Sequence, residues 1–139
     1  MVKFRFYLLF WGLLLTGCSS GSVRNPYLHP PSFRIQVDMN LPQYSALQYA
    51  GNAVYVDGGG IYGVFVYNNG YGYVAFEAAD PNHSPDGCTA MRLSGLRAVC
   101  PCDRNTYSVM DGQLLEGNGT YPMLPYHVSQ NGNLLYIYN

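Results

Sequence analysis

The chain has 139 residues, of which 11% are charged, and its formal net charge is −1. The seven Lys and Arg residues are scattered along it, whereas sequence-independent binding of nucleic acid needs a basic surface that neutralises phosphates. We therefore expect no nucleic-acid partner. Fourteen tyrosines, sixteen glycines and nine prolines favour short strands and tight turns over helices.

Residues 1–17 are expected to be a signal peptide. Lys3 and Arg5 begin the segment, and the apolar run FYLLFWGLLL that follows is too short to span a membrane. The run leads into LTGC, residues 15–18, which resembles the lipobox of bacterial lipoproteins. The resemblance implies cleavage before Cys18 and attachment of lipid to that residue. An ordinary signal peptide followed by a chance cysteine is the alternative.

A lipidated Cys18 determines where the mature protein is expected. Several acyl chains on one residue anchor a protein durably to a membrane. We expect a bacterial cell-envelope protein that faces the periplasm or the cell exterior, with the membrane as its first partner. Residues 18–32 are rich in Ser, Gly and Pro and are expected to form a flexible tether, followed by one domain over residues 33–139.

The expected domain is built of short strands. Residues 33–39 alternate between apolar and polar side chains, which predicts a half-buried strand. Further strands, separated by turns rich in Gly and Asn, are predicted at residues 53–56, 61–67, 73–78, 96–100, 106–110, 126–128 and 133–139. No segment has a helical period. The predicted fold is all-β, a small antiparallel sandwich or incomplete barrel.

Two loops between strands gather residues that often bind metals. The first is DPNHSPDGC, residues 80–88, and the second is CPCD, residues 100–103. Besides Cys18 the chain has three cysteines, and thiols within reach of each other tend to pair in an oxidising compartment. An odd number leaves one cysteine free or bound to something else.

The two loops resemble the Rieske iron–sulfur domain, in which one loop carries C-x-H and the second carries C-x-x-H, often as CPCH. His83 is followed, after sixteen residues, by CPCD. The resemblance extends over residues 53–139, through Tyr107, Gly112, PMLPYHV at 122–128 and GNLLYIYN at 132–139. It implies a Rieske-like β fold with the two loops together at one end.

The same resemblance also implies a degenerate cluster site. A Rieske [2Fe–2S] cluster needs two thiolates on one iron and two imidazoles on the other. Here Asp80 stands near the first cysteine position and Asp103 replaces the second histidine, while His83 and Cys100 are retained. A carboxylate is a poor substitute for a soft thiolate. We expect no cofactor, with a [2Fe–2S] cluster or a single metal ion as the alternative.

Rieske proteins of the respiratory and photosynthetic type have a disulfide between the two loops. Cys88 and Cys102 stand at those positions, so the resemblance implies a Cys88–Cys102 disulfide and a free Cys100. The proximity of the two thiols in CPC leaves a Cys88–Cys100 disulfide open as the alternative.

Other interpretations of these residues follow from their chemistry. Asp80, His83, Cys100 and Asp103 together offer zinc a mixed set of ligands, but aspartates in such sequences ordinarily cap turns, and we expect no metal. Cys100 is either a reactive thiol near His83 or a buried, inert one, and we favour the latter. The tyrosines at 44, 49, 55, 62, 67, 71 and 73 either bind glycans or partner proteins, or pack within the sheet, which we favour.

The sequence gives no sign of an enzyme. It lacks a pair of carboxylates placed for glycoside hydrolysis, a serine nucleophile motif and a phosphate-binding glycine loop. The expected function is that of a non-enzymatic binding or structural module with an envelope protein or glycan as partner. The alternative is an electron-transfer protein with a variant iron–sulfur or mononuclear metal centre.

Overall fold

The computed structural model describes residues 24–139, so the expected signal peptide and Cys18 lie outside the described residues. Within this range, one 3-10 helix (η1, Ser45–Gln48) accompanies the strands β1 (Arg34–Asp38), β2 (Ala53–Val56), β3 (Val64–Asn68), β4 (Tyr73–Glu77), β5 (Arg92–Ser94), β6 (Arg97–Val99), β7 (Thr106–Ser108), β8 (Leu114–Glu116), β9 (Pro125–Asn131) and β10 (Leu134–Tyr138). None of the helices in residues 24–139 has the length and apolar character needed to cross a bilayer.

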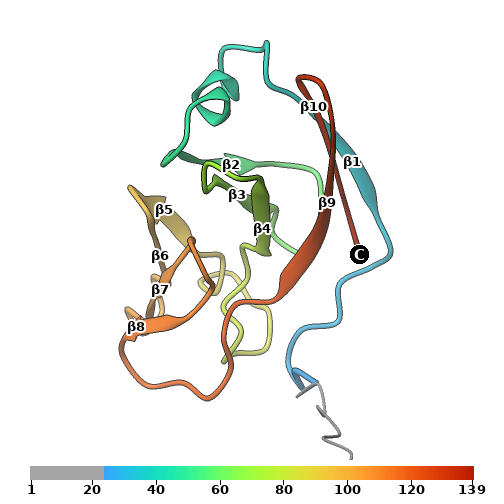
Figure 1. Ribbon diagram of the computed structural model, residues 1–139. Coiled ribbons are helices and arrows are strands. Elements are labelled where there is room, and N and C mark those ends of the chain that lie inside the picture. Colours follow the sequence, from blue (N-terminus) through green and yellow to red (C-terminus); the bar gives the residue numbers. More distant parts are fainter. Residues whose placement is uncertain (1–23) are drawn as a thin grey trace, which may run out of the picture.

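The strands form two antiparallel sheets. The large sheet has the order β1-β10-β9-β4-β3-β2 and the small sheet has the order β5-β6-β7-β8. Figure 1 shows the large sheet curling from β1 around to β2, with the small sheet beside β2, β3 and β4. The chain leaves the large sheet after β4, builds the small sheet, and returns along β9, which pairs with both β4 and β10. The predicted all-β, incomplete-barrel fold is confirmed.

The first core lies on one face of the large sheet. The pairs Ile35–Ile137 and Val37–Leu135 join β1 to β10, so their side chains share a face. The buried members of this core are Val37, Met39, Leu47, Val56, Val64, Val66, Ala75, Tyr126, Leu135 and Ile137. The alternation seen in residues 33–39 therefore indicates the correct inward face.

The second core lies between the large sheet and the small one. Strand β3 contributes to both cores, since Val64 and Val66 face the first core and Phe65 faces the second. This arrangement explains why β3 is apolar at successive positions, as is typical of a strand with both faces covered. The buried members of the second core are Phe65, Phe76, Ala78, Met91, Ala98, Cys100, Tyr107, Val109 and Met123.

Most predicted strands are present, with differences at the edges. Strands β5 and β8 were not predicted, because each has three residues and lies at an edge of the small sheet, where alternation is weak. Residues 45–48 form the short helix η1 within a region for which no helix was predicted. The strand predicted at 61–67 begins later, at Val64, and Glu77 explains the difference.

Glu77, at the end of β4, is fully buried and holds the connection between β2 and β3. Its Oε2 accepts a hydrogen bond from the Ile61 N–H at 2.7 Å, and its Oε1 accepts one from the Tyr62 N–H at 2.9 Å. Oε1 also accepts from the Ala79 N–H at 2.9 Å, and Oε2 from the Tyr126 hydroxyl. The backbone at residues 61 and 62 thus bonds a side chain rather than a neighbouring strand.

The segment before β1 contacts the loops of the domain. The Asn25 Nδ2 donates a hydrogen bond to the Pro81 carbonyl at 2.8 Å, and the Leu28 side chain is buried. Tyr27 packs edge-to-face against Tyr121, with ring centroids 6.1 Å apart. Residues 25–28, expected as part of the tether, therefore lie against the folded domain.

Candidate functional site

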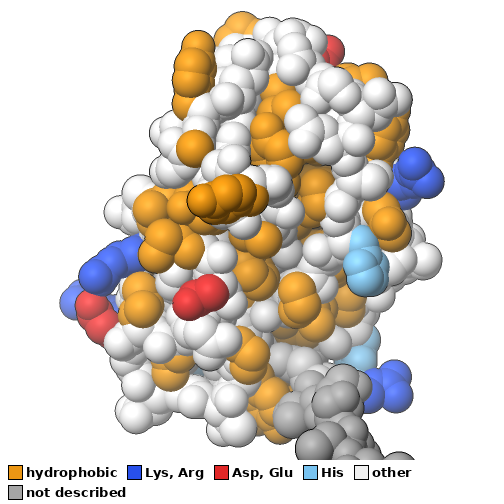
Figure 2. Space-filling view, in the orientation of Figure 1, with side chains coloured by type: hydrophobic (Ala, Val, Ile, Leu, Met, Phe, Trp, Pro, Cys, Tyr) orange, Lys and Arg blue, Asp and Glu red, His pale blue; other side chains and the backbone are white. Residues whose placement is uncertain are grey.

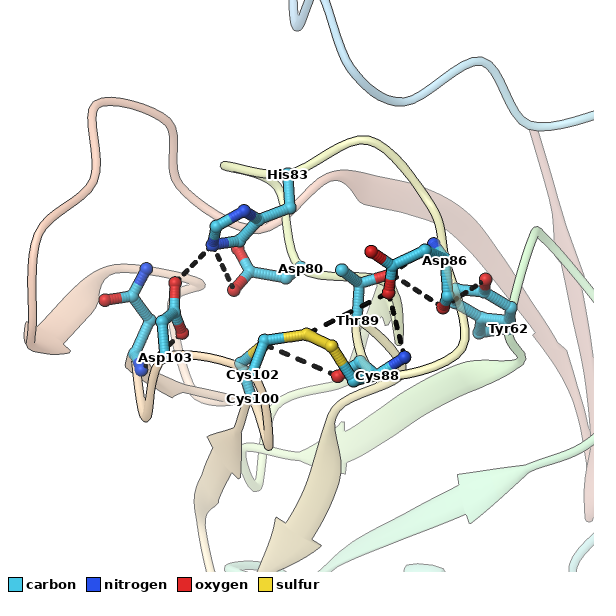
Figure 3. Close-up of a disulfide and its surroundings, with 10 residues drawn as sticks. Tyr62, Asp80, His83, Asp86, Cys88, Thr89, Cys100, Cys102 and Asp103 are labelled. Carbon is cyan, nitrogen blue, oxygen red and sulfur yellow. Dashed lines mark hydrogen bonds and ion pairs between the residues drawn. A yellow bond between two sulfur atoms is a disulfide. The ribbon is translucent and has the colours of Figure 1, made fainter.

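Two loops meet at one end of the small sheet. Residues 78–91 connect β4 to β5, and residues 100–105 connect β6 to β7. The Cys88–Cys102 disulfide joins them, with Cα atoms 5.3 Å apart (Figure 3). The implied disulfide is confirmed, and the Cys88–Cys100 alternative is wrong because Cys100 is a free, buried thiol. Closing a loop of this length stabilises a fold by about 3 kcal/mol in the chain-entropy model.

Cys100 begins the second loop as part of the second core. Its side chain is fully buried, and its Sγ lies 3.8 Å from the Cys88 carbonyl oxygen. Burial raises the pKa of the Cys100 thiol to about 12, and the nearby Asp80 carboxylate adds to the shift. The thiol is therefore protonated at neutral pH, which supports the inert interpretation over the reactive one.

Asp80 follows β4 and is also fully buried. Its Oδ1 accepts hydrogen bonds from the Tyr107 hydroxyl at 2.8 Å and from the Asn82 N–H at 2.9 Å, so the expected turn-capping role is present. Its Oδ2 has no hydrogen-bond partner, and it is the one buried side-chain N or O atom of residues 24–139 in that condition. Burying a polar atom without a partner is unfavourable.

His83 and Asp103 form an ion pair at the partly exposed side of the site. The His83 Nε2 bonds the Asp103 Oδ2, and the side chains are 40% and 29% exposed, respectively. The hydrogen bond to Asp103 raises the pKa of His83. Burial pushes the pKa of Asp103 upward, but hydrogen bonds from His83 and the Asn105 N–H outweigh it and leave that pKa lowered. Both shifts favour the charged forms.

The structure brings three of the four candidate ligand positions close together. One ligand atom each of Asp80, His83 and Asp103 lies within 4.8 Å of the others, and His83 Nε2 is 4.0 Å from Asp80 Oδ2. Figure 3 shows the His83 ring facing both carboxylates, with the disulfide beyond them. Cys100 is not part of this group.

Asparagine side chains, which sequence reasoning missed, fix the loops around the site. The Asn82 Nδ2 donates to the Tyr107 hydroxyl at 2.8 Å and to the Tyr121 carbonyl at 2.9 Å. Its Oδ1 accepts from the Thr120 N–H at 2.7 Å and the Tyr121 N–H at 2.9 Å. Asn82 therefore ties a third loop, residues 117–124, to the first.

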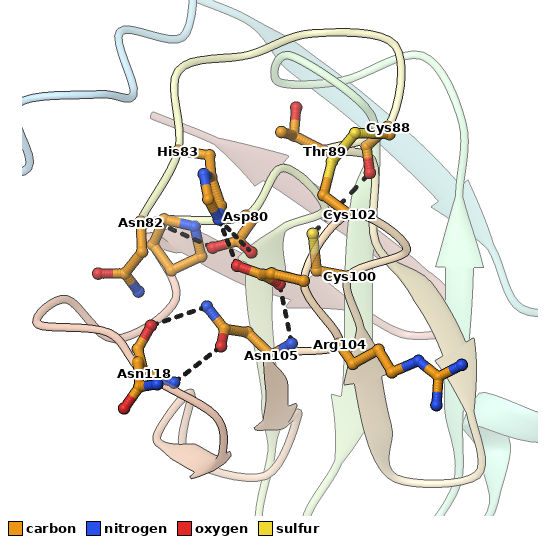
Figure 4. A network of polar contacts seen from close by, with 12 residues as sticks. Asp80, Asn82, His83, Cys88, Thr89, Cys100, Cys102, Arg104, Asn105 and Asn118 are labelled. Carbon is orange, nitrogen blue, oxygen red and sulfur yellow. Dashed lines mark hydrogen bonds and ion pairs between the residues drawn. A yellow bond between two sulfur atoms is a disulfide. The ribbon is translucent and has the colours of Figure 1, made fainter.

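Asn105 makes an equivalent connection from the second loop. Its Nδ2 donates to the Asn118 carbonyl at 3.0 Å and its Oδ1 accepts from the Asn118 N–H at 3.0 Å, as Figure 4 shows. The presence of an asparagine in each loop could have indicated these connections, because an amide side chain can both donate to and accept from backbone groups. The distant partners in residues 117–124 carry no such signal.

The donor set does not fit a Rieske [2Fe–2S] cluster. Such a cluster takes two thiolates and two imidazoles. The Cys88 and Cys102 sulfurs are joined to each other, which leaves one thiol and one imidazole in the two loops. The remaining candidates, Asp80 and Asp103, are carboxylates, which suit harder cations than a thiolate does.

Comparison with known proteins bears on the fold. A scan against protein-family models finds no match, and a search of curated proteins finds no relative. Among solved structures, one chain of the complex of reduced oxygenase and oxidized ferredoxin in carbazole 1,9a-dioxygenase is similar, with a TM-score of 0.50 and 18% identity. The match covers 77% of this chain and 92% of that one. The fold is Rieske-like.

The tyrosines divide between packing and exposure. Tyr44 and Tyr73 pack against the first core, and Tyr62 and Tyr67 against the second. The exposed ones are Tyr49, Tyr55 and Tyr71. Figure 2 shows apolar side chains spread over one face of the molecule with few charged groups among them. Tyr55 also packs against Phe65 and donates a hydrogen bond to the Tyr62 carbonyl, so Tyr49 and Tyr71 are the ones that remain candidates for a partner.

Proposed function

We propose that this chain is a lipid-anchored cell-envelope protein whose Rieske-like domain has lost its [2Fe–2S] cluster. It acts as a non-enzymatic binding or structural module for an envelope protein or glycan. The observation that carries the proposal is the donor set of the two loops, residues 78–91 and 100–105, which hold one free thiol and one imidazole where a cluster needs two of each. The Cys88–Cys102 disulfide takes both of its sulfurs out of the set of possible cluster ligands.

The test is the composition of the purified protein. Protein purified from cells that have adequate iron and a working system for cluster assembly should be colourless and contain neither iron nor acid-labile sulfide. It should give no electron paramagnetic resonance signal after reduction with dithionite. A brown protein with iron and sulfide in equal amounts would overturn the proposal.

The second candidate is an electron-transfer protein with a variant iron–sulfur or mononuclear metal centre. Retention of His83 and Cys100, one potential ligand from each half of a Rieske set, favours this function. Measuring the total transition-metal content together with iron and sulfide separates the two. Under the electron-transfer hypothesis, Cys100→Ala and His83→Gln should each lower the iron content and the electron paramagnetic resonance signal of the reduced protein. Asp86→Asn, in the first loop, should retain both the iron and the signal.

A further inference from the structure

The unpartnered oxygen of Asp80 is the starting point. Glu77, the other buried carboxylate of residues 24–139, receives four hydrogen bonds across its two oxygens. Asp80 receives two, both at Oδ1, while Oδ2 has none. The contrast identifies a buried acceptor that lacks the partner such groups ordinarily have.

That oxygen belongs to a cluster of potential ligands. His83 Nε2 lies 4.0 Å from Asp80 Oδ2 and contacts Asp103 Oδ2, and the three ligand atoms lie within 4.8 Å of one another. Ligands that bind one ion at about 2.0–2.2 Å are about 3–3.5 Å apart. Modest adjustment of the His83 and Asp103 side chains, both partly exposed, would bring all three atoms to such spacings.

The surroundings suit a cation. Within residues 24–139 the Asp80 and Asp103 carboxylates make no ion pair with Lys or Arg, since the one such pair is Arg97–Glu116. Asp80 Oδ1 is held by Tyr107 and Asn82, and Asp103 Oδ1 by the Asn105 N–H at 2.9 Å. Hydrogen bonds of this kind orient metal-binding carboxylates.

We propose that Asp80, His83 and Asp103 bind a single divalent transition-metal ion. The ion would bond Asp80 Oδ2, His83 Nε2 and an oxygen of Asp103, with its remaining positions open to water. One imidazole and two carboxylates suit zinc or manganese, and the ordinary order of affinities places zinc above manganese. Cys100 is not proposed as a ligand, because its sulfur is not one of the three grouped ligand atoms, although its thiol lies near both carboxylates.

The proposal rests on the absence of a [2Fe–2S] cluster from the same loops, and the two can fail separately. A cluster would appear as iron and sulfide in the purified protein. A failure of this proposal would appear as cluster-free protein that does not bind zinc.

The experiment uses tag-free protein, first stripped with a chelator, and calorimetric titration with zinc, manganese and magnesium. Zinc should bind at about one ion per chain, more tightly than manganese, while magnesium should give no binding because the set includes an imidazole. Asp103→Asn and His83→Gln should each weaken zinc binding by about tenfold or more. Asp86→Asn, in the first loop but outside the cluster, should weaken it far less, because Asp86 acts on His83 only through its charge.

Cobalt supplies an independent readout of the ligands. Cobalt bound to the wild type should give weak visible bands without a thiolate-to-metal charge-transfer band, since Cys100 is not a ligand. Lack of zinc binding, zinc affinity unchanged in His83→Gln and Asp103→Asn, or a strong thiolate band would each overturn the proposal. The two variants alter partly exposed side chains, so circular dichroism should show that both remain folded.

Discussion

Tyr107 joins the buried carboxylate of Asp80 to the loop network. Its hydroxyl donates to Asp80 Oδ1 and accepts from Asn82 Nδ2, both at 2.8 Å, and its side chain is fully buried. Burial raises its pKa above the ordinary value. The hydroxyl therefore remains a donor at neutral pH.

Removing this hydroxyl should destabilise the fold. Tyr107→Phe leaves Asp80 Oδ1 and Asn82 Nδ2 each without one partner, and we expect the free energy of unfolding to fall by about 1–3 kcal/mol. Urea denaturation followed by circular dichroism measures the change. Tyr71→Phe is the matched control, because the Tyr71 side chain is fully exposed and its loss of a hydroxyl should change stability by less than about 0.5 kcal/mol. Equal effects of the two substitutions would contradict this role.

The pH dependence of Cys100 labelling is a second residue-scale prediction. In the folded state its thiol has a pKa of about 12, compared with an ordinary value of 9.0, so raising the pH into the mildly basic range produces very little thiolate. Maleimide labelling of folded protein should stay slow from about pH 6 to about pH 8.5, whereas in urea it should accelerate by about tenfold per pH unit. Rapid, pH-dependent labelling without urea would show that Cys100 is accessible.

At the scale of elements, the turn after β7 depends on Gly112. Its φ is +77°, and a Cβ there would lie 2.7 Å from the Phe76 ring. Its N–H donates to the Ser108 carbonyl at 2.8 Å, and its carbonyl accepts from the Met123 N–H at 2.8 Å. This glycine therefore permits both the turn and the contact with the second core.

Gly112→Ala should lower the free energy of unfolding more than a glycine-to-alanine change in a hairpin turn does. Gly132, between β9 and β10, has a φ of +60°, but a Cβ added there would have no atom within 4 Å. Gly132→Ala should cost about 1–2 kcal/mol for the left-handed backbone. Gly112→Ala should cost about 1–3 kcal/mol more, because the methyl group also displaces Phe76. Thermal unfolding of both variants measures the difference, and indistinguishable melting temperatures would refute the steric argument.

The sequence predicted the elements whose pattern is local. Alternation marked β1, and the glycines and asparagines of NNGYG marked the hairpin between β3 and β4. The sequence-based prediction was wrong where contacts between distant residues determine the structure. At residues 61 and 62, for example, the backbone N–H groups bond the Glu77 carboxylate instead of a neighbouring strand. The Rieske resemblance grouped Asp80, His83, Cys100 and Asp103 as one site, and the structure groups all of them except Cys100. The unpartnered Oδ2 of Asp80 was not foreseeable, because it depends on the paths of two loops in space.

At the scale of the whole molecule, the membrane anchor remains a prediction. Replacing Cys18 by Ser should abolish labelling with radioactive palmitate and move the protein from the membrane fraction to the soluble fraction, because residue 18 then has no sulfur to carry lipid. Ser19→Ala is the control and should retain both properties. Continued palmitate labelling of the Cys18→Ser chain would contradict the anchor.

The two hydrophobic cores have a consequence for how this fold tolerates change. None of the buried residues of the first core comes from the segment between β4 and β9, which carries both loops and the small sheet. Substitution of a ligand in those loops therefore removes no buried member of the first core, whereas the second core, which includes Cys100, lies directly beside them. The chemistry of the two loops can therefore change by substitution while the first core keeps all of its buried members.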